Sequence, residues 1–192
     1  MTTFNKENKI ITVVGLAGSG KTEAVNYITN KGYPRVYFGG VIYDAMNESG
    51  IEITPESQQK FREEIREKEG KDFVVKRVIK QTHDLISSGQ HRIILDGLYS
   101  WTEYKILKHE FPGEVVTLAV VAPKHIRYHR LENRPERPFT FEESEERDRS
   151  EIENLEKGGP IAMANYFLTN DGTLEDLHHQ IDKILEETKF YE

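Results

Sequence analysis

Cysteine is absent from the 192-residue sequence, and tryptophan occurs once. Without cysteine the chain can form no disulfide, no zinc–thiolate site and no catalytic thiol. No apolar run approaches the roughly 20 residues that a membrane-spanning helix needs, and the polar segment 1–9 lacks the apolar centre of a signal peptide. These absences lead us to expect a cytoplasmic protein with no membrane partner.

Basic residues are outnumbered by acidic ones, and the formal net charge is −7. A protein dedicated to nucleic-acid binding usually has a basic surface, so we expect no nucleic-acid partner. The hydrophobic share of 36% and the charged share of 31% describe an ordinary folded protein, and the length suits a single domain, 1–192. Composition leaves the oligomeric state open between monomer and homodimer.

Apolar strand-like runs alternate with helical segments, which is typical of βαβ units and a parallel sheet. Strands are expected at residues 10–14, 35–38, 92–95, 115–121 and 166–169. Helices are expected between and after them, with capping residues at Thr54, Thr140 and Thr173. The sequence therefore predicts an α/β fold.

The helix and strand pattern is less regular at three places: two segments that contain paired glycines and one helix with few apolar residues. Gly39 and Gly40 are expected between the second strand and a short helix, and the segment 158–160 is expected to break the long polar helix that follows Thr140. The helix that ends near Gly70 carries few apolar residues, mainly at positions 61 and 65. We expect it to pack loosely at the periphery.

A glycine-rich motif lies directly after the first strand and directly before a helix. It reads Gly15-Leu16-Ala17-Gly18-Ser19-Gly20-Lys21-Thr22 and fits G-x-x-x-x-G-K-[ST]. Its glycines let backbone N–H groups surround phosphate oxygens, and the helix N-terminus adds partial positive charge. Lys21 is expected to reach the β- and γ-phosphates, and the Thr22 hydroxyl to ligate Mg²⁺. The motif predicts ATP and Mg²⁺ as ligands.

Asp96 ends the third strand, beside the strand that leads into this motif. A carboxylate there suits Mg²⁺ held directly or through water, although a turn or cap role is the plain alternative. The turn after the last strand is expected at the ligand-binding end of the sheet, where Asn170 and Gly172 can contact the base of the nucleotide while the turn also caps a helix.

Arginines gather in the segment after the fourth strand. They are Arg127, Arg130, Arg134, Arg137, Arg147 and Arg149. Phosphoryl transfer spreads negative charge over the equatorial oxygens, and arginines on a closing segment stabilise that charge. Arg130, Arg134 and Arg137 are the first candidates, because 134–138 is a proline-stiffened loop suited to a lid. The alternative is that these arginines form surface ion pairs with the many glutamates.

With these motifs in view, the chain resembles the nucleoside-monophosphate-kinase and dephospho-CoA-kinase branch of the P-loop kinases, and also the archaeal adenylate-kinase-related proteins. The likeness covers nearly the whole chain, through the glycine-rich motif, Leu95-Asp96-Gly97, Val121-Ala122-Pro123, Arg130-Leu131 and the stretch from Ala162 to Gly172. It implies a P-loop NTPase fold: a five-stranded parallel sheet in the order 2-3-1-4-5 flanked by helices. It also implies an acceptor-binding lobe at about 40–70 and a lid at about 134–149.

The sequence departs from these families on the acceptor side. Dephospho-CoA kinases have an acidic residue just after the second strand, where this chain has Gly39 and Gly40, and the nearest acid is Asp44. Adenylate kinases follow Asp-Gly with Pro-Arg, where this chain has the segment 98–100. We therefore expect Asp44 to be an acceptor contact or base, and the acceptor to be a small nucleotide-like molecule.

The expected activity is transfer of the γ-phosphate of ATP to that acceptor, either a nucleoside monophosphate or dephospho-CoA. The alternative from another class is an ATP-binding regulatory module with weak ATPase activity. A kinase that acts on nucleic-acid ends is disfavoured by the negative net charge.

Overall fold

The computed structural model describes residues 7–70 and 72–191. The described strands are β1 (Lys9–Val14), β2 (Arg35–Tyr37), β3 (Arg92–Asp96), β4 (Val115–Val121) and β5 (Tyr166–Thr169). The described helices are α1 (Lys21–Thr29), α2 (Phe38–Glu48), α3 (Pro55–Glu69), α4 (Phe73–Ser87), α5 (Trp101–Glu110), α6 (Lys124–Glu132), α7 (Phe141–Glu153), α8 (Gly158–Ala162) and α9 (Leu174–Glu187).

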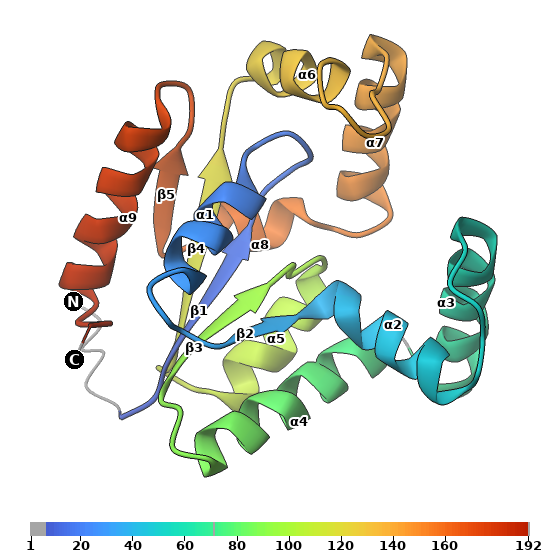
Figure 1. Cartoon of the computed structure of the whole chain (residues 1–192), viewed down its shortest axis with the longest axis horizontal. Helices are drawn as coiled ribbons and strands as arrows, with labels where there is room; N and C mark the ends of the chain where they lie inside the picture. Colours follow the sequence, from blue (N-terminus) through green and yellow to red (C-terminus); the bar gives the residue numbers. More distant parts are fainter. Residues whose placement is uncertain (1–6, 71, 192) are drawn as a thin grey trace.

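The strands form one parallel sheet in the order β2-β3-β1-β4-β5, which confirms the expected topology (Figure 1). In its register, Val13 of β1 lies opposite Asp96 of β3 on one side and Leu118 of β4 on the other. The first strand is thus central, with β3 and β4 beside it. Ligands of such sheets bind outside the carboxyl ends of the strands, at the point where the strand order reverses.

The sheet is covered on both faces, so its strands are continuously apolar rather than alternating. One face packs on α2, α4 and α5 through residues such as Ile10, Ile93 and Leu95. The other face packs on α1 and α9 through residues such as Ile11 and Ile94. Successive strand residues point to opposite faces, which is why neighbours in the sequence belong to different halves of the core.

Helix α2 begins earlier than the glycine pattern predicts. Phe38 is its first residue, and Gly39 and Gly40 lie inside the helix rather than before it. The ring of Tyr37 explains the glycines, because a Cβ on Gly39 would lie 2.4 Å from the Tyr37 Cζ atom. The glycines serve close packing of a ring against a helix, which local sequence rules cannot distinguish from a break.

The segment 158–160 also behaves differently from the expectation. Helix α7 ends at Glu153, and Gly158, Gly159 and Pro160 open the short helix α8. Gly159 lies against the indole of Trp101, since a Cβ there would be 2.7 Å from Trp101 Cε3. Helix α3 is anchored more firmly than its thin apolar stripe predicts, because Phe61 is buried in the core with α2 and α4.

Two helix starts follow the predicted capping boxes. The Thr140 hydroxyl accepts a hydrogen bond from the Glu143 N–H, and the Glu143 carboxylate accepts one from the Thr140 N–H. Thr173 and Asp176 form the same pair at the start of α9. Each pair satisfies two backbone donors at a helix N-terminus. They fix the ends of α7 and α9 on either side of β5.

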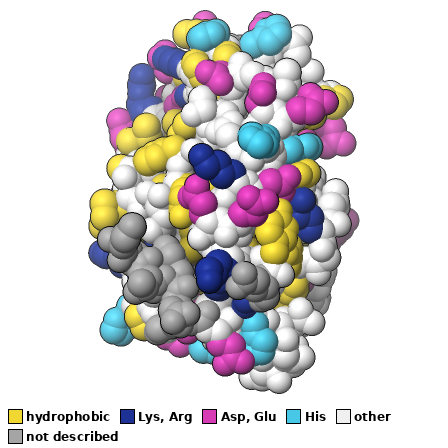
Figure 2. Space-filling view, turned by 90° about the vertical axis from the view of Figure 1, so that its left-hand side faces the viewer, with side chains coloured by type: hydrophobic (Ala, Val, Ile, Leu, Met, Phe, Trp, Pro, Cys, Tyr) yellow, Lys and Arg dark blue, Asp and Glu magenta, His cyan; other side chains and the backbone are white. Residues whose placement is uncertain are grey.

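Helices α6 and α7 lie together beyond the carboxyl ends of β1 and β4, at the upper right of Figure 1. Helix α3 projects away from the sheet, beyond the C-terminal end of α2. On the face that carries α9, acidic, basic and histidine side chains are intermixed with scattered hydrophobic ones (Figure 2). In the described part of the chain, no helix combines the length and apolar character needed to cross a bilayer.

Candidate nucleotide-binding site

The glycine-rich loop joins β1 to α1 and curls over the carboxyl end of β1. Gly18 and Gly20 have φ angles of +75° and +99°, which favour glycine. A Cβ on Gly18 would lie 2.6 Å from the Arg127 carbonyl oxygen, and one on Gly20 would lie 2.0 Å from the Asn170 side-chain nitrogen. Both glycines are therefore required by conformation and by space, as the phosphate-binding motif predicts.

Lys21 is the first residue of α1 and turns back toward the loop, where its ammonium group donates to the Leu16 carbonyl oxygen at 3.3 Å. Burial lowers the pKa of Lys21 from 10.5 to about 8. The nearby charges of Lys157 and Arg147 contribute to this lowering of the pKa, whereas those of Glu151 and Asp96 oppose it. An anion bound in the loop would therefore stabilise the charged form of Lys21.

Asn170, directly after β5, connects the loop to α6. Its side-chain nitrogen donates to the Ser19 carbonyl oxygen at 2.8 Å, and its side-chain oxygen accepts from Arg130 at 3.4 Å. Asn170 is buried, and one guanidinium nitrogen of Arg130 is buried without a hydrogen-bond partner among the described residues. Ser19 likewise has a buried hydroxyl without such a partner. The structure therefore brings three of the predicted site residues together, while Gly172 lies in the exposed turn that follows.

Arg127 fastens α6 to both the loop and α7. Its guanidinium donates to the Ala17 carbonyl oxygen at 3.0 Å and makes a bidentate pair with Asp148 at 2.8 and 2.5 Å. The Tyr128 hydroxyl donates to the same carboxylate at 3.2 Å. Arg127 is buried, so this pair is shielded from water and its planar geometry suits it to a fixed position. Arg127 therefore holds helices together in this structure.

Glu151, on α7, places a negative charge against the glycine-rich loop. Its carboxylate accepts from the Ala17 N–H at 3.3 Å and pairs with Lys157 at 2.9 Å and with Arg147 at 3.1 Å. The side chains of Glu151 and Lys157 are only 4% and 1% exposed. Burial lowers the pKa of Lys157, and the adjacent Glu151 opposes that shift. A buried ion pair, Glu151 with Lys157, thus lies against the glycine-rich loop, and the half-exposed Arg147 adds a second cation to it.

Asp96 lies at the carboxyl end of β3, on the sheet face that α1 covers, and pairs with Arg35 from the start of β2. Arg35 also lies over the ring of Tyr37, 4.8 Å from its centroid. Carboxylate and hydroxyl oxygens such as those of Asp96 and Thr22 are the ligands that Mg²⁺ prefers. No group of three or more His, Cys, Asp or Glu residues forms a metal site among residues 7–70 and 72–191.

The remaining predicted site residues lie apart from this cluster. Arg134 donates to the carbonyl oxygen of Arg137 and stacks over the ring of Phe139, 4.2 Å from its centroid. Arg137 is exposed and has a φ of +50°. Asp44 is exposed on α2 and has no hydrogen bond or ion pair with another described residue. Their roles toward a nucleotide or an acceptor stay predictions.

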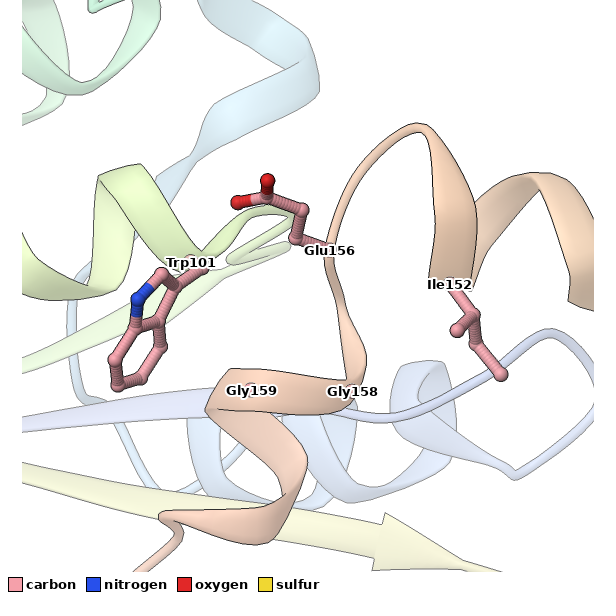
Figure 3. Close-up of a pocket in the computed structure, with 5 residues that line it drawn as sticks. All are labelled: Trp101, Ile152, Glu156, Gly158 and Gly159. Atoms are coloured by element: carbon pink, nitrogen blue, oxygen red, sulfur yellow. The ribbon is translucent and has the colours of Figure 1, made fainter.

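A cavity of about 370 Å³ lies beside the Glu151 cluster, between the start of α5 and the connection from α7 to α8. Figure 3 shows Trp101 on one side of it, with Glu156 and Ile152 across from the indole and the backbone of 158–159 below. A second hollow, of about 250 Å³, shares Glu156 with it and is lined by Tyr99 and Asn154 among others. Burial raises the pKa of Tyr99, so its hydroxyl remains a neutral donor.

Sequence reasoning missed Arg35, Glu151 and Lys157. A signal for Glu151 exists, because the polar helix α7 carries Ser144, Asp148 and Glu151 at helical spacing, and all three side chains are largely shielded from solvent. Charged residues at helical spacing are ordinarily a solvated face. Only the fold reveals that this one is buried.

The family model described as an AAA domain matches residues 11–154. The chain is also 32% identical over 181 residues to a UPF0200 protein of Thermococcus kodakarensis, an alignment that covers 93% of this chain and 97% of the relative. The chain belongs to the AAA domain family and to the UPF0200 proteins. The match ends at Asn154, so it includes the glycine-rich loop, Asp96, Arg127 and Glu151 but not Asn170.

Solved structures with a similar fold include kinases. Shikimate kinase from Acinetobacter baumannii in complex with shikimate superposes with a TM-score of 0.57 at 19% identity, covering 98% of this chain and 99% of that one. Dephospho-CoA kinase from Campylobacter jejuni superposes with a TM-score of 0.55 at 14% identity, covering 95% and 98%. At these identities the likeness establishes the fold. The AAA domain protein described here therefore has a kinase-like P-loop fold.

Proposed function

We propose that this chain is an ATP-dependent phosphotransferase that moves the γ-phosphate of ATP to a small, nucleotide-like acceptor. The observation that supports this proposal is the loop from Gly15 to Thr22, whose glycines have positive φ angles and beside which Lys21 has a pKa lowered by burial. Backbone donors, a helix N-terminus and a lysine are the set that binds nucleotide phosphates. The nucleoside-monophosphate-kinase and dephospho-CoA-kinase branch supplies the first acceptor candidates.

In this proposal the chain acts by binding and by electrostatics. Lys21 and the loop N–H groups hold the β- and γ-phosphates. Asn170, together with Arg130, supports the loop from the side of the turn after β5, where the base of the nucleotide is expected. An acceptor oxygen attacks the γ-phosphorus, the bond from phosphorus to the bridging oxygen of ADP breaks, and the acceptor proton leaves to Asp44 or to solvent. Arg134 and Arg137 close over the transferring group in the lid at about 134–149.

Thr22 and Asp96 are the residues that would hold Mg²⁺. Such an ion is bound by one or two protein oxygens together with substrate phosphates, and this donor set fits that requirement. The ion supplies charge neutralisation between the phosphates. Arg35, which pairs with Asp96 in the structure, has to share or release that carboxylate when the ion arrives.

The test is ADP production from ATP and Mg²⁺ against a panel of acceptors: the ribo- and deoxynucleoside monophosphates, dephospho-CoA and shikimate. Lys21→Ala removes the phosphate contact, and Lys183→Ala removes an exposed lysine of α9 as the matched control. Stimulation by one acceptor that is lost in Lys21→Ala and kept in Lys183→Ala supports the proposal. ATP binding with slow hydrolysis and no stimulation by any acceptor favours the regulatory alternative.

A further inference from the structure

The carboxylate of Glu151 lies against the glycine-rich loop, where three donors converge on it. Its two oxygens receive three donors: the Ala17 N–H at 3.3 Å, the Lys157 ammonium at 2.9 Å and the Arg147 guanidinium at 3.1 Å. A loop N–H and two cations around one anionic group is the arrangement with which proteins bind phosphate oxygens. Here a side chain of the same protein provides the anion.

A phosphate group and this carboxylate exclude each other. Both need the Ala17 N–H, and two anions at one site repel each other strongly in buried surroundings. The side chain of Glu151 is 4% exposed, so solvent screens its charge only weakly. A phosphate that enters the loop therefore has to displace Glu151 or bind more weakly.

The two cations need an anion whether or not Glu151 is present. Lys157 is 1% exposed, and a buried ammonium without a partner is strongly destabilising. If Glu151 leaves while the loop is empty, Lys157 loses its ion-pair partner, and only the more remote charges of Asp96 and Glu103 still oppose the positive charge of Lys21 and Lys157. If a phosphate takes its place, the charge balance is kept. Exchange of the Glu151 carboxylate for a phosphate is therefore favoured over loss of the carboxylate alone.

The surrounding chain leaves space for this exchange. Glu151 lies in the last turn of α7, and the connection to α8 includes Glu156 in a left-handed conformation with φ of +53°. The cavity of about 370 Å³ lies directly beside this connection, with Ile152 and Trp101 on its walls (Figure 3). The end of α7 therefore borders open space rather than packed core.

We propose that Glu151 is a built-in competitor of nucleotide phosphates, which fills the glycine-rich loop of the ligand-free chain and passes Lys157 and Arg147 to the phosphate when it binds. In naming ATP as the incoming ligand, this inference rests on the proposed function. The apparent affinity for phosphate is then reduced by the fraction of chains whose loop Glu151 occupies. Lys157 becomes a phosphate ligand contributed by the segment that follows α7.

The experiment measures binding of MgATP and of tripolyphosphate by calorimetry to the wild-type chain, Glu151→Gln and Glu153→Gln. Glu153 is the matched control, because it lies on the same helix but is exposed and contacts no cation. Removing the competing charge at Glu151 should tighten both ligands by about tenfold, within the usual range of coupling between two ligands. Glu153→Gln should bind both as the wild type does.

Thermal unfolding separates this role from a purely structural ion pair. Without ligand, Glu151→Gln should unfold at a lower temperature than the wild type because Lys157 loses its anion, and saturating tripolyphosphate should remove most of that difference. An equal loss of thermal stability with and without ligand would overturn the inference. If Glu151→Gln does not fold, Glu151→Asp retains the charge, is too short to reach Ala17, and should tighten tripolyphosphate in the same direction.

The two ligands distinguish failure of this inference from failure of the proposed function. Unchanged or weaker binding of tripolyphosphate by Glu151→Gln and Glu151→Asp sinks the competitor role, even if the chain proves to be a kinase. Tighter tripolyphosphate without binding of ATP by any variant supports the competitor role and counts against the proposed function. Trp101, the single tryptophan, lies on the cavity beside the moving segment, so its fluorescence should change on tripolyphosphate binding.

Discussion

The lowered pKa of Lys21 makes nucleotide binding sensitive to pH in the alkaline range. In the ligand-free chain, burial sets this pKa at about 8, so the ammonium loses its proton between pH 7 and pH 9. Bound phosphates favour the charged form and keep the proton on Lys21. The dissociation constant for ATP should therefore rise about tenfold from pH 7 to pH 9, measured by calorimetry.

The variant Lys21→Arg distinguishes titration of Lys21 from titration of its buried neighbour Lys157. Lys21→Arg keeps a positive charge at every pH of the experiment, so the slope should flatten if Lys21 causes it. Burial also lowers the pKa of Lys157, which shares the neighbours Glu151 and Arg147 with Lys21. A full tenfold slope that persists in Lys21→Arg would assign the effect to Lys157 instead.

At the scale of single residues, the sequence predicts best where backbone chemistry decides. Gly18, Gly20 and Lys21 follow from a motif whose loop wraps around phosphate, and in the structure both glycines have positive φ angles and Lys21 turns back toward the loop. The sequence does not indicate that Glu151 and Lys157 are buried, because a charged residue is almost never fully buried unless it is paired. The partners of a buried pair come from tertiary packing, which no local pattern contains.

A buried pair, Arg127 with Asp148, helps to hold helix α7 against α6. Their side chains are 7% and 14% exposed, so removal of the carboxylate leaves an uncompensated guanidinium. Asp148→Ala should lower the free energy of unfolding by about 3 kcal/mol, the usual cost of breaking a buried pair on one side. Chemical denaturation followed by circular dichroism measures this change.

A surface pair on the same helix provides the control. Glu146 lies 3.8 Å from Arg149, and both side chains are more than half exposed. Glu146→Ala should change the free energy of unfolding by no more than about 0.5 kcal/mol, since exposed pairs contribute little. Equal effects of Asp148→Ala and Glu146→Ala would show that Arg127 does not fasten α7.

At the scale of helices and strands, local signals were reliable at capped ends and unreliable at glycines. The capping boxes at Thr140 and Thr173 are complete within four residues, so sequence alone identifies them. Gly39 is expected before a helix and Gly159 at a helix break, yet each lies in a helix where an aromatic ring leaves no room for a Cβ. The reason for these glycines lies in tertiary contacts.

At the scale of the whole molecule, the strand order 2-3-1-4-5 is confirmed, but hydrophobic periodicity did not provide it. Periodicity indicates that strands exist and that both faces are buried, whereas order depends on pairings between distant segments. The order came from resemblance to P-loop kinases. The placement of an acceptor lobe at about 40–70 and of a lid at about 134–149 has the same origin, and both stay predictions.

The two ends of the described chain are tied through Lys9. Its ammonium group donates to the carbonyl oxygens of Thr188 at 2.8 Å and Lys189 at 2.7 Å, just beyond the end of α9, and the side chain is buried at the start of the central strand. A cation at a helix C-terminus satisfies carbonyls that have no partner within the helix. Lys9 thereby joins the first strand of the sheet to the last helix.

Lys9→Met keeps most of the aliphatic stem and removes the charge and the donors. We expect the free energy of unfolding to fall by about 2–3 kcal/mol, because hydrogen bonds to a charged donor contribute more than neutral ones and the buried carbonyls lose their partner. Urea denaturation followed by Trp101 fluorescence measures the change. Lys80→Met is the control, since its side chain is 76% exposed and its pair with Asp84 lies at the surface. If both variants stay within about 0.5 kcal/mol of the wild type, the tie between the first strand and α9 contributes nothing to stability, and other contacts of that helix, such as the packing of Leu177, Ile181 and Leu185, hold it on the sheet.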